Sequence, residues 1–119
     1  MQKFNLHHNE QNKYALVLPE NKNALCVLGD KQDNAVQIIS DPGQHNSSWF
    51  EIVRADKGNY AQKGYLIKTH GVDKAFDISG SKAEDGKKVW QHNIHQAGNQ
   101  VWLILPVNEP KQPEVIPKV

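Results

Sequence analysis

The hydrophobic residues of this chain fall in short runs that alternate with clusters of Gly, Asn, Asp and Pro. No window keeps apolar residues at the helical period, whereas short runs rich in Val, Ile, Leu, Tyr and Trp between such turn clusters are typical of strands. The pattern therefore predicts an all-β protein. The expected strands are 3–6, 14–18, 24–28, 35–39, 49–54, 65–69, 75–78, 88–92 and 101–105, and the expected turns are 21–23, 29–30, 41–43, 57–59, 71, 85–86 and 97–99.

The order of strands and turns occurs twice. Tyr14, Leu16, Ala24, Leu25, Val27 and Gly29 recur 51 residues later as Tyr65, Ile67, Ala75, Phe76, Ile78 and Gly80. Val36, Asn46, Trp49, Phe50 and Ile52 recur 53 residues later as Val89, Asn99, Trp102, Leu103 and Leu105. We therefore predict two complete four-stranded repeats, at about 13–54 and 64–105, and the strand 2–6 matches the last strand of a third repeat.

The two tryptophans at matching positions, Trp49 and Trp102, are predicted to lie in the core. A length of 119 residues suits one domain, which we place at 1–106. Residues 107–119 carry Pro110, Pro113 and Pro117, which remove backbone donors and favour an extended tail.

Charge, apolar run length and cysteine content argue against several classes of partner and location. The net charge is +1, from 14 basic and 13 acidic residues, so we expect no nucleic-acid partner. The sequence contains no apolar run long enough for a membrane span or a signal peptide, and we expect a cytoplasmic or non-classically secreted protein. Cys26 is the only cysteine, which excludes an internal disulfide, and we expect it to be a small buried residue.

The segment 74–105 holds the side chains suited to a polyol. Asp77 is a hydroxyl acceptor, Trp90 and His92 are flat rings for the C–H face of a sugar, and Asn99 is an amide on the next turn. The alternative for Asp77 is an ordinary solvent-facing or turn-bonding aspartate.

Other chemistries have weaker support in the sequence. His92 and His95, or His7 and His8, lack the further ligands that zinc sites need, so we expect no metal and no cofactor. The acidic residues Glu84 and Asp85 share one polar loop, and a glycosidase needs two acids across a cleft. No nucleophile motif is present, and we expect that the protein is not an enzyme.

Four segments of the second repeat carry a family resemblance: FDISG at 76–80, DG at 85–86, VWQH at 89–92 and NQVW at 99–102. This pattern resembles the ricin-type β-trefoil lectins, the family of Gln-x-Trp repeats, over roughly residues 1–106. The resemblance implies a threefold arrangement of four-stranded units, with the Trp of each last strand in a shared core and a shallow sugar pocket on each unit.

The resemblance also assigns roles to residues of the second repeat. Asp77 falls at the sugar-hydroxyl acceptor, His92 at the stacking ring, Asn99 at the amide that bonds a hydroxyl, and Gln100 at the neighbour that supports the acid. Trp90 stands where the family often has Gln, and would widen the stacking surface or cover the domain. The implied function is a lectin module for a galactose or GalNAc-type sugar, with a carbohydrate or glycoconjugate as partner.

The first repeat departs from the family, with Cys26 at the acidic position, Ile39 at the ring and Ser47 in place of the Gln, so only Asn46 survives. We expect this repeat to be structural. Two units leave sheet edges uncovered, which favours a symmetric homodimer or fusion to a larger chain. The alternative function is a protein-interaction β-trefoil without sugar binding, such as a protease inhibitor or a toxin or haemagglutinin-type subunit.

Overall fold

A computed structural model describes residues 3–43, 45–69, 73–79 and 88–105, and its strands pair antiparallel throughout. The strands are β1 (Asn5–His8), β2 (Tyr14–Val17), β3 (Ala24–Val27), β4 (Val36–Asp41), β5 (Glu51–Arg54), β6 (Tyr65–Lys68), β7 (Lys74–Ile78) and β8 (Val89–Asn93). Their bounds lie within two residues of the predicted runs, and the all-β prediction is confirmed. The predicted turns at 71 and 85–86 and the tail 107–119 lie outside the described residues.

Three short 3-10 helices complete the described elements: η1 (Leu28–Asp30), η2 (Asn46–Ser48) and η3 (Gly58–Tyr60). No helix in the described ranges is long and apolar enough to cross a membrane.

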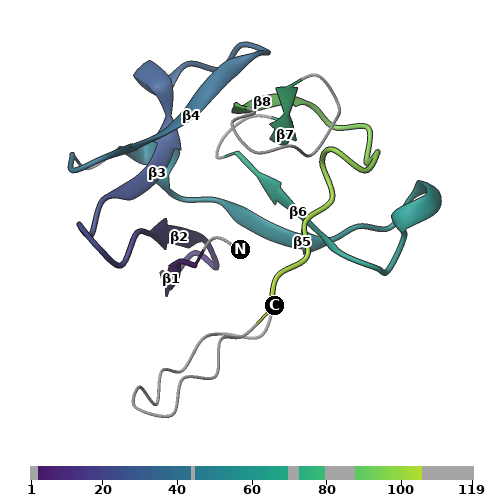
Figure 1. Ribbon diagram of the computed structural model, residues 1–119, viewed down its shortest axis with the longest axis horizontal. Coiled ribbons are helices and arrows are strands. Elements are labelled where there is room, and N and C mark those ends of the chain that lie inside the picture. Colours follow the sequence, from purple (N-terminus) through teal and green to yellow (C-terminus); the bar gives the residue numbers. More distant parts are fainter. Residues whose placement is uncertain (1–2, 44, 70–72, 80–87, 106–119) are drawn as a thin grey trace.

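The strands follow the order β1-β2-β3-β4-β8-β7-β6-β5, so the two halves of the chain meet where β4 pairs with β8. Figure 1 shows the β3–β4 and β7–β8 hairpins next to each other on one side of the molecule, with β1, β2, β5 and β6 on the other. Each half therefore contributes one hairpin to a common surface.

In each half, one isolated β-bridge joins the first strand of the repeat to the segment that follows its hairpin. Tyr14 pairs with Phe50 in the first half, and Tyr65 pairs with Trp102 in the second. Each bridge has two backbone hydrogen bonds, 2.7 and 2.8 Å long for Tyr14 and Phe50, and both 2.8 Å for Tyr65 and Trp102.

The predicted strand 101–105 is wrong, because that segment meets β6 only at the bridge of Trp102. A Cβ atom on Gly64 would lie 2.8 Å from the carbonyl oxygen of Trp102, so the two backbones cross closely at one point. Leu103 and Leu105 are 73% and 52% exposed and do not alternate into the core.

The core is built from one buried side chain of each of β2, β3, β4, β6 and β7, together with Phe50 just before β5. Its buried members are Leu16, Val27, Ile38, Phe50, Ile67 and Phe76. The rings of Phe50 and Phe76 meet edge to face with centroids 4.8 Å apart, and the Trp102 ring packs on Phe76 at 6.5 Å. Because Phe50 comes from the first half and Phe76 from the second, one core serves both halves.

The strand register corrects the predicted repeat. In the two hairpins Cys26 pairs with Ile39 and Asp77 pairs with Trp90, so the spacing between the halves is still 51 residues there. The closing bridges then give a spacing of 52, which matches Phe50 with Trp102. The predicted spacing of 53, which matched Trp49 with Trp102, is wrong because the loops between hairpin and closing bridge differ by one residue.

Trp49 is therefore not the counterpart of Trp102. Phe50 is fully buried, whereas Trp49 is half-buried and lines a surface cavity. The core prediction holds for Trp102, which packs against the buried cluster, and is wrong for Trp49.

We predict that Phe50→Ala lowers the free energy of unfolding by about 3–5 kcal/mol, because it removes a fully buried ring and leaves a cavity. Trp49→Ala should cost clearly less, although it removes a larger side chain. Urea unfolding followed by circular dichroism measures both values, and an equal or larger loss for Trp49→Ala would contradict the corrected register.

Candidate functional site

Asp77 lies on the face of β7 opposite the core. Phe76 points into the buried cluster, so the next side chain points to the other face of the hairpin. Asp77 pairs directly with Trp90 of β8, and His92 follows two residues later on the same face. The structure thus brings together the acceptor and both predicted rings.

Three side chains donate hydrogen bonds to the carboxylate of Asp77. Trp90 Nε1 and Asn99 Nδ2 both donate to Oδ1 at 3.0 Å, and Gln100 Nε2 donates to Oδ2 at 2.9 Å. His95 Nε2 lies 3.4 Å from Oδ2. The side chain of Asp77 is only 6% exposed, so these donors replace most of the water that a free carboxylate would bind.

Gln100 holds the turn and the acid together. Its Nε2 also donates to the carbonyl oxygen of Asn93 at 2.8 Å, and its Oε1 accepts from the backbone N–H groups of His95 and Gln96 at 2.9 and 3.1 Å. Gln100 is fully buried. This amide therefore fixes both the loop before Asn99 and one oxygen of Asp77.

The two rings lie side by side on the hairpin. The centroids of Trp90 and His92 are 6.4 Å apart, with 36° between their planes, and both side chains are half-buried. The Nδ1 atom of His92 is buried and has no hydrogen-bond partner among the described residues. The two rings therefore lie near each other on the face of the hairpin that carries Asp77.

All five predicted site residues, Asp77, Trp90, His92, Asn99 and Gln100, lie within this cluster. Sequence reasoning placed Gln100 beside the acid, but gave Trp90 only a stacking or covering role. The indole N–H bond to Asp77 depends on the cross-strand pairing of two residues 13 apart. His95, treated only as a metal candidate, was missed as a neighbour of the acid.

The equivalent place on the first hairpin has different chemistry. Cys26 stands at the position of Asp77, Ile39 at that of Trp90, and Asp41 at that of His92, since Asp41 and His92 pair with Ala24 and Ala75. The predicted match of Ile39 with His92 is therefore wrong.

The first-half residues that correspond to Asn99 and Gln100 also differ from the predicted ones. The backbone N–H of Ser48 donates to the carbonyl oxygen of His45 at 3.0 Å, and the backbone N–H of Gln100 donates in the same way to Ala97 at 2.9 Å. Ser48 lies two residues before the bridge residue Phe50, and Gln100 lies two residues before the bridge residue Trp102. Ser48 thus stands at the position of Gln100, and Ser47 at that of Asn99. Asn46 is not the counterpart of Asn99, which corrects the prediction that this amide survives.

A polar cluster surrounds Cys26. The imidazole of His45 bonds Asp30 at 3.0 Å and Asp41 at 2.5 Å, and these two hydrogen bonds, that of Asp30 first, raise the pKa of His45. Hydrogen bonds from Ser47 and then from His45 lower the pKa of Asp30. Burial raises the pKa of the Cys26 thiol, and the charges of Asp41 and Asp30 raise it further.

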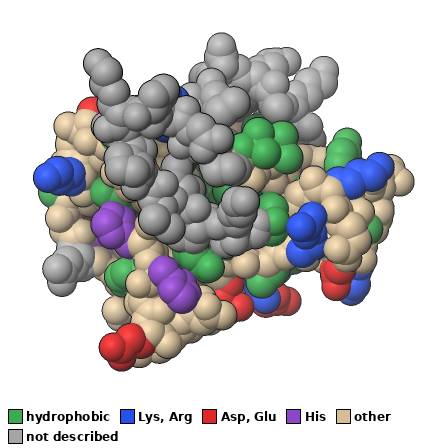
Figure 2. Space-filling view, turned by 90° about the horizontal axis from the view of Figure 1, so that it is seen from below, with side chains coloured by type: hydrophobic (Ala, Val, Ile, Leu, Met, Phe, Trp, Pro, Cys, Tyr) green, Lys and Arg blue, Asp and Glu red, His purple; other side chains and the backbone are tan. Residues whose placement is uncertain are grey.

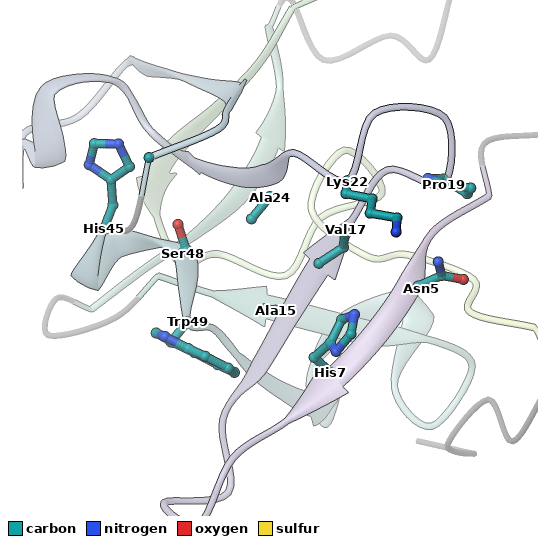
Figure 3. Close-up of a pocket in the computed structure, with 11 residues that line it drawn as sticks. Asn5, His7, Ala15, Val17, Pro19, Lys22, Ala24, His45, Ser48 and Trp49 are labelled. Carbon is teal, nitrogen blue, oxygen red and sulfur yellow. The ribbon is translucent and has the colours of Figure 1, made fainter.

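Two cavities lined by described residues lie away from Asp77. The larger, of about 650 Å³, lies between β1, β2 and the turn before η2, with Trp49 and His45 toward one end and His7 and Lys22 toward the other (Figure 3). The smaller, of about 400 Å³, is lined by residues of β5, β6 and neighbouring loops, including Arg54, Asp56 and Gln96.

The strand pairings, the shared core and the closing bridges define a β-trefoil-like protein. The chain is similar in structure to ThreeFoil, a designed three-fold symmetric protein, with a TM-score of 0.77 and 21% identity over 87% of this chain and 71% of ThreeFoil. It is also similar to a mosquitocidal holotoxin, with a TM-score of 0.73 and 22% identity over 87% of this chain and 12% of the holotoxin.

These comparisons confirm the β-trefoil prediction at the level of the fold, because identities this low establish no more than the fold. The chain spans a small part of the holotoxin's length. No protein-family model matches the chain, and a search of curated proteins finds no match.

We predict that Gln100→Ala destabilises the fold by about 2–4 kcal/mol, because Oδ2 of Asp77, the carbonyl oxygen of Asn93 and two backbone N–H groups each lose the hydrogen bond to the Gln100 amide. Ser48→Ala is the matched control, since the hydroxyl at the equivalent position has no partner among the described residues. Thermal and urea unfolding of both variants provide the measurement. Equal effects would contradict the role assigned to Gln100.

Proposed function

We propose that this protein is a carbohydrate-binding module, without catalytic activity, whose site is the cluster around Asp77 in the second half. The observation that carries the proposal is the carboxylate held by Trp90, Asn99 and Gln100 beside a pair of rings. An oriented acceptor, a ring surface and an amide are the groups that recognise a sugar.

The carboxylate retains capacity for a ligand. The two oxygens of a carboxylate can accept roughly four hydrogen bonds, and Asp77 accepts three from its neighbours. About one acceptor position therefore remains for a ligand. Because these donors fix its orientation, a sugar hydroxyl would meet an acceptor that needs little reorganisation. The proposed bond from a hydroxyl to a carboxylate is charge-assisted and therefore stronger than a neutral one.

The rings and the amide complete the proposed recognition. His92 would stack on the apolar face of the sugar, and Trp90 would extend that surface while its indole N–H holds Asp77. Asn99, whose Nδ2 already bonds Asp77, would present its carbonyl oxygen to a second hydroxyl. A galactose or GalNAc-type sugar is the proposed ligand, following the resemblance to the Gln-x-Trp lectins.

A single shallow site of this kind binds weakly. We expect a dissociation constant on the order of 1 mM, which corresponds to about −4 kcal/mol. Useful avidity would then come from several sites joined in a dimer or a larger chain.

The second candidate is a protein-interaction β-trefoil. Two observations favour it: Asp77 is only 4% exposed, and apolar side chains such as Leu103, at 73%, lie on the surface. In this alternative the cluster around Asp77 only stabilises the hairpin, and the loops carry the contacts. Binding to a protein partner with no binding to any glycan would favour it over the lectin.

We predict that His92→Ala weakens binding to immobilised galactose at least tenfold, because the stacking ring is lost while the hydrogen bonds to Asp77 remain. Asp77→Asn should abolish binding. The matched control is Asp73→Asn, which changes an exposed aspartate beside the same strand.

Glycan-array binding and isothermal titration provide the measurements, with circular dichroism to confirm that each variant is folded. Retention of full affinity in folded His92→Ala and Asp77→Asn would overturn the proposed site. Absence of glycan binding by the unchanged protein would overturn the lectin itself.

We also propose that the chain pairs with a second copy, because Leu103 and Leu105 are exposed two residues apart on one segment and apolar side chains also lie on the face shown in Figure 2. Light scattering should then give twice the 13.5 kDa mass of one chain. The double variant Leu103→Glu, Leu105→Glu should shift the mass toward one chain, because charges at exposed leucines oppose an apolar interface. A single-chain mass for the unchanged protein at high concentration would contradict the dimer.

A further inference from the structure

Three groups that bind metals converge on the first hairpin. Cys26 lies on β3, Asp41 ends β4, and His45 follows in the turn before η2. One ligand atom from each, the thiol sulfur, a carboxylate oxygen and a ring nitrogen, lies within 4.8 Å of the other two. Cys26 is 1% exposed, whereas Asp41 and His45 are half-buried.

A fourth residue orients the imidazole. The Nδ1 atom of His45 bonds Asp30 at 3.0 Å, which leaves Nε2 facing Asp41. Asp30 is itself held by the hydroxyl of Ser47. A carboxylate on the second ring nitrogen is the arrangement that fixes the tautomer and orientation of metal-bound histidines.

We propose that Cys26, Asp41 and His45 form a three-ligand site for a zinc-type divalent cation. Thiolate, imidazole and carboxylate are the protein ligands of zinc, with bonds of about 2.0–2.3 Å. Tetrahedral ligand atoms at that range lie about 3.3–3.8 Å apart. The Nε2 and carboxylate oxygen now 2.5 Å apart would therefore separate by about 1 Å as the cation replaces the proton between them.

The charge of the site suits a divalent cation. Two carboxylates, Asp30 and Asp41, lie beside His45, and a deprotonated Cys26 adds a third negative charge. A divalent cation neutralises most of this charge within one cluster, whereas a buried thiolate without a cation would be strongly disfavoured.

Space for a fourth ligand lies on the side of Gly43. A Cβ atom at Gly43 would lie 3.1 Å from His45 Nε2 and 3.5 Å from the Asp41 carboxylate. Because glycine has no Cβ atom, the space beside these two ligands stays open. Gly43, His45 and Ser48 also line the cavity of about 650 Å³ in Figure 3. His45 is the one proposed ligand among the residues that line this cavity, so water or a ligand group that completes the tetrahedron would approach from the side of Gly43 and His45.

Cobalt(II) tests the proposal directly, because it reports both ligand type and geometry in its spectrum. A thiolate bound to cobalt gives a charge-transfer band in the near ultraviolet, and tetrahedral coordination gives intense visible bands. Cys26 is the only cysteine in the chain, so a charge-transfer band has one source. We expect both features on titration of the full chain, and their reversal on addition of zinc.

Matched variants assign the ligands. Cys26→Ser should abolish the charge-transfer band, while His45→Gln and Asp41→Asn should lower zinc affinity at least tenfold in isothermal titration. His7→Gln, at the other end of the same cavity, should leave both unchanged. Because Cys26 is buried, the half-buried Asp41 and His45 variants keep the test valid if Cys26→Ser fails to fold.

A cobalt spectrum without a charge-transfer band would overturn the proposal. So would unchanged zinc affinity in His45→Gln and Asp41→Asn. Neither outcome depends on sugar binding, since Asp77 and its donors Trp90, Asn99 and Gln100 lie in the second half of the chain.

Discussion

The contact between Phe50 and Phe76 is the packing interaction on which the rest of the fold depends. Phe50 closes the first half through its bridge with Tyr14, and Phe76 anchors β7 in the second half. With their rings edge to face, the two halves share one core instead of forming two small ones. The pairing of β4 with β8 then fixes the two hairpins next to each other.

This core decides which residues are free to carry chemistry. Val27 and Phe76 point inward, so their neighbours Cys26 and Asp77 point to the opposite face of each hairpin. Those outer positions do not contribute to the shared cluster and can differ between the halves without loss of packing. One scaffold therefore presents a carboxylate with amide donors on one hairpin and a thiol with His45 on the other.

Most of the fold could be predicted from the sequence. Runs such as 65–69 and 75–78 are short, rich in apolar residues and separated by turn residues, so their strands were placed within two residues. The match between repeats failed at Trp49 and Phe50, because hydrophobicity does not distinguish two adjacent aromatic residues. A loop one residue longer reverses which of them faces the core, and only the bridge of Tyr14 resolves it.

The candidate sites were predictable to different degrees. Asp77, Asn99 and Gln100 lie in segments whose order resembles a lectin repeat, so their proximity followed from the resemblance. The bond from Trp90 to Asp77 required the hairpin register. Cys26 and His45 are 19 residues apart on β3 and in the turn before η2, and no local pattern joins them.

The residue at the position of Asp77 depends on the residue at the position of Gln100, and the first half has Cys26 and Ser48 at these two positions. A buried carboxylate needs donors, and the long amide of Gln100 reaches Asp77 at 2.9 Å. Ser48 stands at the position of Gln100 but is two bonds shorter, and its buried hydroxyl has no partner within the described ranges. A carboxylate at Cys26 would therefore lack that donor and would face the negative charges of Asp30 and Asp41. A thiol remains neutral unless a cation or a base removes its proton, so Cys26 fits this position where a carboxylate would not.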